Sequence, residues 1–110
     1  MRRILILLVT ISSLFVLLGC IGEEKDVVPP TIHGAKDITY YIGRPQPNYM
    51  TGVTASDHID GDLTDMILVD DSLVDLTSPG FYDLFYRVKD LSGNETVVKI
   101  SVIVIKLSTP

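Results

Sequence analysis

The last third of the chain alternates between two sets of residues, and this pattern constrains the fold more than any other feature. One set of alternate positions is largely apolar and consists of Tyr82, Leu84, Tyr86 and Val88. The intervening set is Phe81, Asp83, Phe85, Arg87 and Lys89. After a turn at 91–94, a second alternating run carries Thr96, Val98, Ile100, Val102 and Val104. A period of two is typical of a half-buried strand, so the sequence predicts a long β-hairpin with one buried face.

The segment between residue 31 and this hairpin shows no sustained helical periodicity. Short strands are predicted over 38–42, 53–55, 67–70 and 73–74, with a Gly- and Pro-rich turn at 43–47 and a loop at 56–62. One helical turn is expected over 63–66, capped by Asp62. Tyr82 follows Pro79-Gly80 and is placed like the tyrosine of a tyrosine corner, whose hydroxyl bonds to the backbone. About seven short strands in this length predict an all-β sandwich over 28–106, followed by a tail at 107–110.

The N-terminus reads as an export signal. Arg2 and Arg3 precede an apolar run from Ile4 to Leu18, which is shorter than the roughly 20 residues that a membrane-spanning helix needs. A signal peptide over 1–19 is therefore preferred to a membrane span. Its removal takes away two basic residues and lowers the formal charge from −5 to −7. Such an acidic domain is unsuited to nucleic acid or to an anionic lipid surface.

The tetrad Leu17-Leu18-Gly19-Cys20 resembles the bacterial lipobox. The resemblance implies that Cys20 is acylated, for example with palmitate, and becomes the mature N-terminus of a protein anchored on the extracytoplasmic face of the cell membrane. Residues 20–27 would then form a lipidated tether, in which the five or six residues between the lipid and Asp26 reach roughly 20 Å at most. The alternative is that Cys20 is an incidental thiol after an ordinary export signal. Because a single cysteine cannot form an internal disulfide, acylation explains it better.

Five motifs of the domain carry a family resemblance. They are the segments at 28–32, 55–64, 74–80, 82–86 and 89–94, in which Val-Pro-Pro-Thr-Ile, Asp-Gly-Asp-Leu-Thr, Ser-Pro-Gly, Tyr-Asp-Leu-Phe-Tyr and Asp-Leu-Ser-Gly-Asn stand out. In order and spacing they resemble the bacterial immunoglobulin-like domain family typified by repeats in pesticidal crystal proteins, a relative of the hyalin repeat. The resemblance implies an immunoglobulin-like β-sandwich that serves as a module of adhesins, secreted enzymes and surface proteins.

Aspartates are concentrated between residues 57 and 75, where seven of them occur without any Lys or Arg. In an immunoglobulin-like sandwich the start of the domain, the loop at 56–62 and the final hairpin turn lie at one end. Carboxylates from these segments suit Ca²⁺, which takes six to eight oxygen ligands. The candidate calcium ligands are Asp26, Asp57, Asp60, Asp62 and Asp90. The alternative is that these aspartates cap turns and solvate the surface.

Other chemistry has little support in the sequence. His33 and His58 are not spaced as a zinc pair, and the consecutive residues of Ser56-Asp57-His58 cannot converge as a catalytic triad. We therefore expect no enzyme. Cross-strand neighbours on the outward phase form a candidate partner surface, unless a loop or the first strand covers them: Phe81, Phe85, Ile103 and Ile105.

The preferred function is that of a surface lipoprotein whose single module serves in adhesion, binding or scaffolding at the cell envelope, with the lipid bilayer and an envelope protein or polysaccharide as partners. The alternative is an accessory subunit that docks another envelope protein through its last hairpin.

Overall fold

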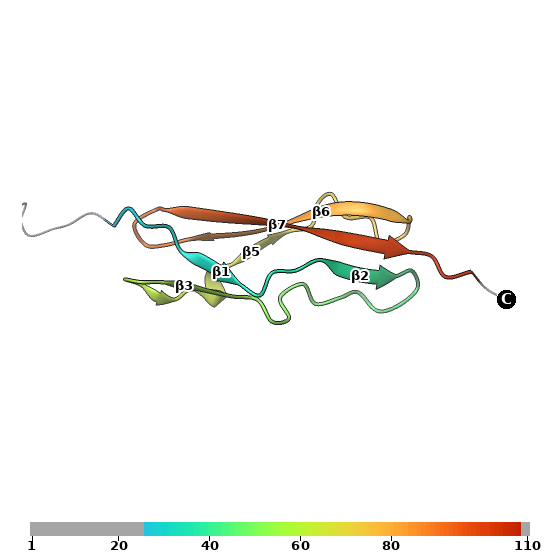
Figure 1. Ribbon diagram of the computed structural model, residues 1–110, viewed down its shortest axis with the longest axis horizontal. Helices are drawn as coiled ribbons and strands as arrows, with labels where there is room; N and C mark the ends of the chain where they lie inside the picture. The colour runs from blue at the N-terminus through green and yellow to red at the C-terminus, as the bar shows by residue number, and fades with distance from the viewer. Residues whose placement is uncertain (1–25, 109–110) are drawn as a thin grey trace, which may run out of the picture.

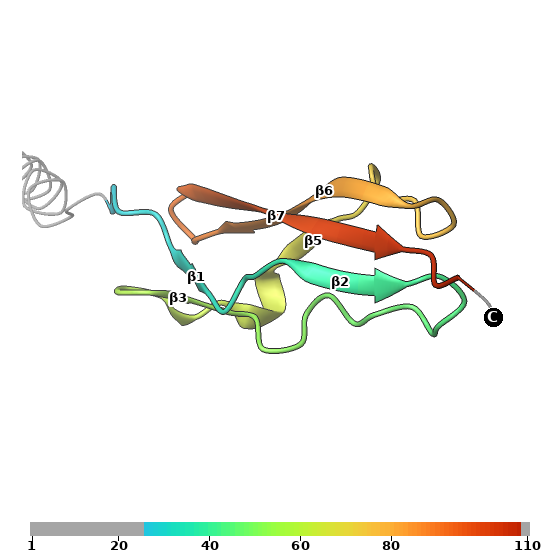
Figure 2. The same cartoon turned by 45° about the vertical axis from the view of Figure 1, so that its right-hand side comes forward.

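The computed structural model describes residues 26–108, which form two β-sheets packed against each other (Figures 1 and 2). One sheet has the order β1 (Thr31–His33), β3 (Thr54–Asp57) and β4 (Gly61–Asp62). The other has the order β2 (Ile38–Tyr41), β7 (Glu95–Ile105), β6 (Gly80–Lys89) and β5 (Leu68–Asp70). All pairs are antiparallel except β2 and β7, which are parallel. The predicted all-β sandwich is confirmed.

The hairpin of β6 and β7 is the longest feature of the fold and runs the length of the domain (Figure 1). Its pairing runs from Gly80 opposite Val104 to Lys89 opposite Glu95. The inward phase was predicted correctly, since Leu84 and Val102 are fully buried and Tyr86 is nearly so. These side chains form the centre of the core, and residues of the other strands pack around them.

The shorter elements follow the prediction with three differences, one of which is that β3 and β4 extend into the segment 56–62 that was predicted as a loop. A single 3₁₀ turn, η1 (Thr64–Met66), replaces the expected helical turn, and Asp62 accepts hydrogen bonds from the N–H and hydroxyl of Thr64 at its start. The prediction of a strand at 73–74 is wrong. The N–H groups of Ser72 and Val74 donate to Asp70 Oδ1 and to the carbonyl of Asp71, so they close local turns and do not join a sheet.

Gly34 lets the chain cross from one sheet to the other between β1 and β2. It has φ of +80°, and a Cβ at this position would lie 2.0 Å from the carbonyl oxygen of Gly52. The backbone of the 51–53 segment therefore occupies the space that any other residue would need. Only glycine fits both the left-handed conformation and this close approach.

Tyrosine hydroxyls tie loops to the strands in a chain that has no tryptophan and one cysteine, which lies outside the described residues. The buried hydroxyl of Tyr86 donates to the carbonyl of Tyr49 (2.6 Å), and Tyr40 donates to the carbonyl of Arg44 (2.6 Å). Tyr82 donates to the carbonyl of Ser78 (2.7 Å), as the predicted tyrosine corner requires. Each bond satisfies a hydroxyl and a loop carbonyl together.

The two ends of the sandwich differ. The start of the described chain, the β3–β4 turn and the β6–β7 turn lie at one end, whereas the C-terminus and the end of β2 lie at the other (Figure 1). The predicted signal peptide at 1–19, Cys20 and most of the tether at 20–27 lie outside the described residues. Within 26–108, no helix has the length and apolar character needed to cross a membrane.

Replacing Gly34 by Ala should destabilise the domain more than replacing Gly43, which also has positive φ (+95°) but has open space around it. The conformational cost alone, which Gly43→Ala reports, is about 1–2 kcal/mol. Gly34→Ala adds a collision with backbone and should cost about 3 kcal/mol or more. Urea denaturation followed by circular dichroism measures both. Equal losses would contradict the close approach to Gly52.

Replacing Tyr86 by Phe should leave the carbonyl of Tyr49 buried without its donor, at a cost of about 1–3 kcal/mol. Tyr41→Phe is the control, because Tyr41 is on the same sheet but its side chain is exposed. Thermal unfolding of the two variants should show a lowered midpoint only for Tyr86→Phe. Similar midpoints would show that the buried hydrogen bond contributes little.

Candidate functional site

Four aspartates from three distant segments meet at the end of the sandwich where the described chain begins. One carboxylate oxygen from each of Asp26, Asp57, Asp60 and Asp90 lies within 4.8 Å of the others. We call these four residues the acidic cluster. The sequence predicted the meeting of the three segments, and four of its five candidate ligands are present.

The fifth candidate, Asp62, is not a member of the cluster. Its Oδ1 accepts hydrogen bonds from the N–H (3.0 Å) and hydroxyl (2.6 Å) of Thr64, and the side chain is exposed. Asp70 and Asp75 bond in the same manner to Ser72 and Thr77. Hydrogen bonds from Thr64, Ser72 and Thr77 lower the pKa of these three carboxyls. Asp62, Asp70 and Asp75 thus cap turns. This is the alternative role that the sequence offered for the aspartates.

Asp57 and Asp60 belong to the tight turn between β3 and β4. Asp57 is the last residue of β3, and its Oδ2 accepts hydrogen bonds from the N–H groups of Ile59 (3.0 Å) and Asp60 (3.1 Å). Gly61, with φ of +76°, completes the turn. Asp60 in turn accepts a hydrogen bond from the N–H of Leu91 (2.8 Å), which links this turn to the β6–β7 hairpin.

Asp90 and Asn94 close the β6–β7 hairpin. Asp90 Oδ1 accepts from the N–H groups of Ser92 (3.0 Å) and Asn94 (2.9 Å), and its Oδ2 accepts from Asn94 Nδ2 (2.9 Å). Burial of the Asp90 carboxyl favours a raised pKa, but the hydrogen bonds with Asn94, with the Asp26 side chain and with Ser92 outweigh it, and the pKa lies below its usual value. The hairpin turn therefore holds the Asp90 carboxyl in a fixed orientation.

The first described residues are fastened to the same hairpin. Asn94 Nδ2 also donates to the carbonyl of Asp26 (2.9 Å), and the hydroxyl of Thr96 donates to the carbonyl of Pro30 (2.5 Å). Asp26 Oδ1 accepts from the N–H of Val28 (3.0 Å). Asn94 was not among the predicted site residues. The feature that could have identified Asn94 is its position at the end of the Asp-Leu-Ser-Gly-Asn turn, because an amide side chain there can hydrogen-bond neighbouring backbone groups.

Within residues 26–108 the acidic cluster has no cationic partner, so it concentrates negative charge. The single ion pair among residues 26–108 is Arg87 with Glu95 (3.7 Å), outside the cluster. Asp26, Asp57 and Asp90 are only 8%, 7% and 5% exposed. Two of their oxygens, Asp26 Oδ2 and Asp57 Oδ1, are buried and find no hydrogen-bond partner in the described part of the chain. Two like charges 4 Å apart repel by about 4 kcal/mol at the effective dielectric constant of a protein surface, so the bare cluster is costly.

The candidate partner surface lies on the outer face of the four-stranded sheet, at the end opposite the acidic cluster. Phe81 is opposite Ile103 on the neighbouring strand and is 79% exposed, so no described loop or strand covers it. Ile105 and Tyr41, which are register partners on β7 and β2, are also exposed. We call Tyr41, Phe81, Ile103 and Ile105 the apolar patch. Tyr41 was missed because the alternating pattern does not reveal that β2 pairs with β7.

Phe85 lies further along the same face and is half-buried, opposite Lys99. The guanidinium of Arg87 lies over its ring, 5.8 Å from the centroid. Phe85 is therefore partly covered by a charged side chain, unlike Phe81, and contributes less apolar surface than the sequence predicted.

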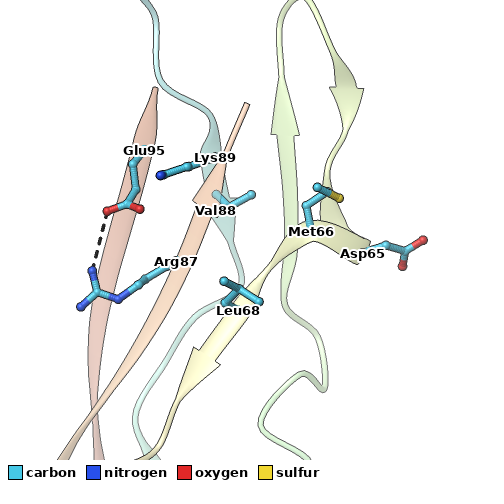
Figure 3. Close-up of a pocket in the computed structure, with 7 residues that line it drawn as sticks. All are labelled: Asp65, Met66, Leu68, Arg87, Val88, Lys89 and Glu95. Carbon is cyan, nitrogen blue, oxygen red and sulfur yellow. Dashed lines mark ion pairs between the residues drawn. The ribbon is translucent and has the colours of Figure 1, made fainter. Parts of the chain in front are cut away.

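A hollow of about 410 Å³ lies between η1, β5 and the half of the hairpin nearer the β6–β7 turn (Figure 3). Met66, Leu68 and Val88 give it a mainly apolar lining. Asp65 points away from the strands, and Glu95 is paired with Arg87 (Figure 3). The two acidic residues of the lining are thus not arranged as a general acid and base.

The remaining residues considered in the sequence are the histidines and Cys20. His33 Nε2 lies 3.1 Å from Ser56 Oγ, whereas Asp57 on the same strand is directed into the acidic cluster. Ser56 and Asp57 thus have different partners. Cys20 lies outside the described residues, so its acylation stays a prediction.

Comparison with solved structures identifies proteins of the same fold. A structure with the CBM51-2 module in complex with GlcNAc and INT domains from Clostridium perfringens ZmpB is 24% identical, with a TM-score of 0.59, and the match covers 71% of this chain and 17% of that one. A structure of the M60 catalytic domain of ZmpB with its two CBM51 modules is 23% identical, with a TM-score of 0.60, covering 74% and 8%. The lipoprotein BT2262 from Bacteroides thetaiotaomicron is 23% identical, with a TM-score of 0.54, covering 74% and 40%.

The chain therefore spans less than half the length of each of these proteins, and at these identities the likeness concerns the fold. A search of curated protein sequences finds no match. The family comparison is more direct, because residues 30–104, which include all the strands except the last residue of β7, match the family described as bacterial surface protein, Ig-like domain. With its seven strands in two packed sheets, the chain belongs to this family of bacterial surface immunoglobulin-like domains.

Proposed function

We propose that the chain is a non-enzymatic lipoprotein of the cell envelope, anchored through acylated Cys20, whose module presents its far end to a binding partner in adhesion or scaffolding. One observation carries this role. The first described residue and the apolar patch lie at opposite ends of the sandwich, so an anchor on one side leaves the patch directed away from the membrane (Figure 2).

The lipobox and a short tether support the anchor. Asp26 follows Cys20 by six residues, which span roughly 20 Å when fully extended. Because Asp26 is buried and bonded to the hairpin, little slack separates the lipid from the folded domain. One protein of the same fold, BT2262, is itself described as a lipoprotein.

The composition of the apolar patch supports a binding role. Phe81 and Tyr41 present exposed aromatic side chains, a residue type enriched at interfaces. Aromatic rings also stack on the C–H faces of sugar rings, which fits polysaccharide contact. The aliphatic side chains of Ile103 and Ile105 specifically favour the second candidate, an accessory subunit that docks another envelope protein through its last hairpin.

Replacing Cys20 by Ser should release the protein from membranes, because the thioether and amide that carry the acyl chains can no longer form. Gly19→Ala is the matched control, since it keeps a small residue before the cysteine and should keep the protein in the membrane fraction. Cell fractionation with a high-salt wash measures both. Retention of Cys20→Ser would contradict the lipid anchor.

Replacing Phe81 by Ala should weaken capture of the partner at least about tenfold, as for a central interface residue. Leu91→Ala is the control, because Leu91 is equally exposed (83%) but lies at the end nearer the anchor. A pull-down from detergent-solubilised membranes and a glycan-array screen are run with both variants. A Phe81-dependent protein supports docking, and a Phe81-dependent sugar signal supports polysaccharide contact. Binding that is insensitive to Phe81 would contradict a role for the patch.

A further inference from the structure

We infer that the acidic cluster of Asp26, Asp57, Asp60 and Asp90 binds one Ca²⁺ ion, which fastens the start of the domain to both turns at that end of the sandwich. This site is independent of the apolar patch and of the nature of the partner.

Buried oxygens without partners are the first observation in favour of an ion. Polar atoms removed from water are almost always hydrogen-bonded, because an unpaired one is costly. Asp26 Oδ2 and Asp57 Oδ1 break this rule within one cluster. Both belong to side chains that are more than nine-tenths buried. A cation held by these oxygens would satisfy both of them and would reduce the repulsion among the four carboxylates.

The orientation of the carboxylates is the second observation. In Asp26 and in Asp57, one oxygen accepts hydrogen bonds from backbone N–H groups, and the other oxygen is the unpartnered one. Asp90 is held by Ser92 and Asn94, and Asp60 by Leu91. Hydrogen bonds that fix a carboxylate while leaving an oxygen available are typical of the residues around a metal ligand.

The donor set selects the ion. Only carboxylates make up the cluster, and Zn²⁺ favours His and Cys ligands. Mg²⁺ demands near-octahedral geometry at about 2.0–2.1 Å and keeps several waters. Ca²⁺ accepts six to eight oxygens at about 2.3–2.6 Å in irregular arrangements, which suits carboxylates brought together from three segments.

An ion at this site would link the tether to the domain. We call this link the joint. Asp26 comes directly after Lys25, and the other ligands lie in the β3–β4 and β6–β7 turns of the two different sheets. Calcium would therefore close the sandwich at its anchored end and fix where the chain leaves the domain.

Thermal unfolding of the full chain, purified in detergent and freed of metal with a chelator, tests the inference. With a Kd of about 10⁻⁴ to 10⁻³ M, as in extracellular calcium modules, 10 mM CaCl₂ should raise the midpoint by roughly 5–20 °C. MgCl₂ at the same concentration should give a smaller shift. An unchanged midpoint in calcium, or an equal shift with magnesium, would overturn the assignment of a calcium site.

Asp57→Asn separates ion binding from a merely structural role. The variant should lose at least nine-tenths of the calcium shift, yet in chelator it should unfold at or above the wild-type midpoint because one repelling charge is gone. Asp62→Asn is the matched control from the same loop and should keep the full shift, since within residues 26–108 the Asp62 side chain bonds Thr64 alone. An Asp57→Asn protein that is destabilised in chelator and still responds fully to calcium would overturn the inference.

Should Asp57→Asn fail to fold, Asp26→Asn provides the same comparison. Trypsin provides a readout besides stability, because Lys25 precedes the ligand Asp26. Calcium should slow cleavage after Lys25 at least fivefold in the wild type and in Asp62→Asn, but not in Asp26→Asn. Cleavage at the same rate with calcium and with chelator would overturn the proposed joint.

Discussion

The pairing of β6 with β7 is the constraint on which the rest of the structure depends. Ten register pairs hold the two strands together from Gly80 to Lys89. Because side chains alternate across the strands, this register sends Leu84, Tyr86 and Val102 into the core and leaves Phe81 and Ile103 on the outer face. The same hairpin ends in the turn that presents Asp90. Core, patch and acidic cluster thus follow from a single register.

The hairpin also explains why the ends of the domain have different chemistry. At one end, Asn94 and Thr96 of the hairpin bond the carbonyls of Asp26 and Pro30, and the N–H of Leu91 bonds Asp60. Polar contacts with the start of the chain and with the β3–β4 turn dominate there. At the other end, β2 lies parallel beside β7 and adds Tyr41 to an apolar surface. A polar end and an apolar end can therefore be distinguished within one small module.

Much of this arrangement could be predicted from the sequence, and the physical reasons for the failures differ. The alternation of apolar residues predicted the strands at 80–89 and 95–105, because a helix of this length would place apolar residues three or four positions apart and not two. It did not reveal the parallel pairing of β2 with β7, because alternation carries no information about a strand's partner or direction. The strand expected at 73–74 failed because Asp70 and Asp71 capture the neighbouring N–H groups, which short-range turn chemistry decides.

The acidic cluster shows the same limit. Topology brought Asp26, Asp57, Asp60 and Asp90 together, but Asp62 bonds the adjacent Thr64. The local sequence Asp-Leu-Thr does not show that Asp62 lies outside the cluster, since Asp90 stands in a similar Asp-Leu-Ser sequence and belongs to the cluster. The difference lies in burial, which depends on where each turn sits in the folded sandwich.

Amide hydrogen exchange measured by NMR, with calcium and with chelator, tests the account most directly. Six N–H groups donate to carboxylates of the acidic cluster, those of Val28, Ile59, Asp60, Leu91, Ser92 and Asn94. Calcium should slow their exchange, while Ser72 and Thr77, which donate to aspartates outside the cluster, should exchange unchanged. Exchange unaffected by calcium, or slowed equally at all eight amides, would contradict a calcium ion that joins the three segments.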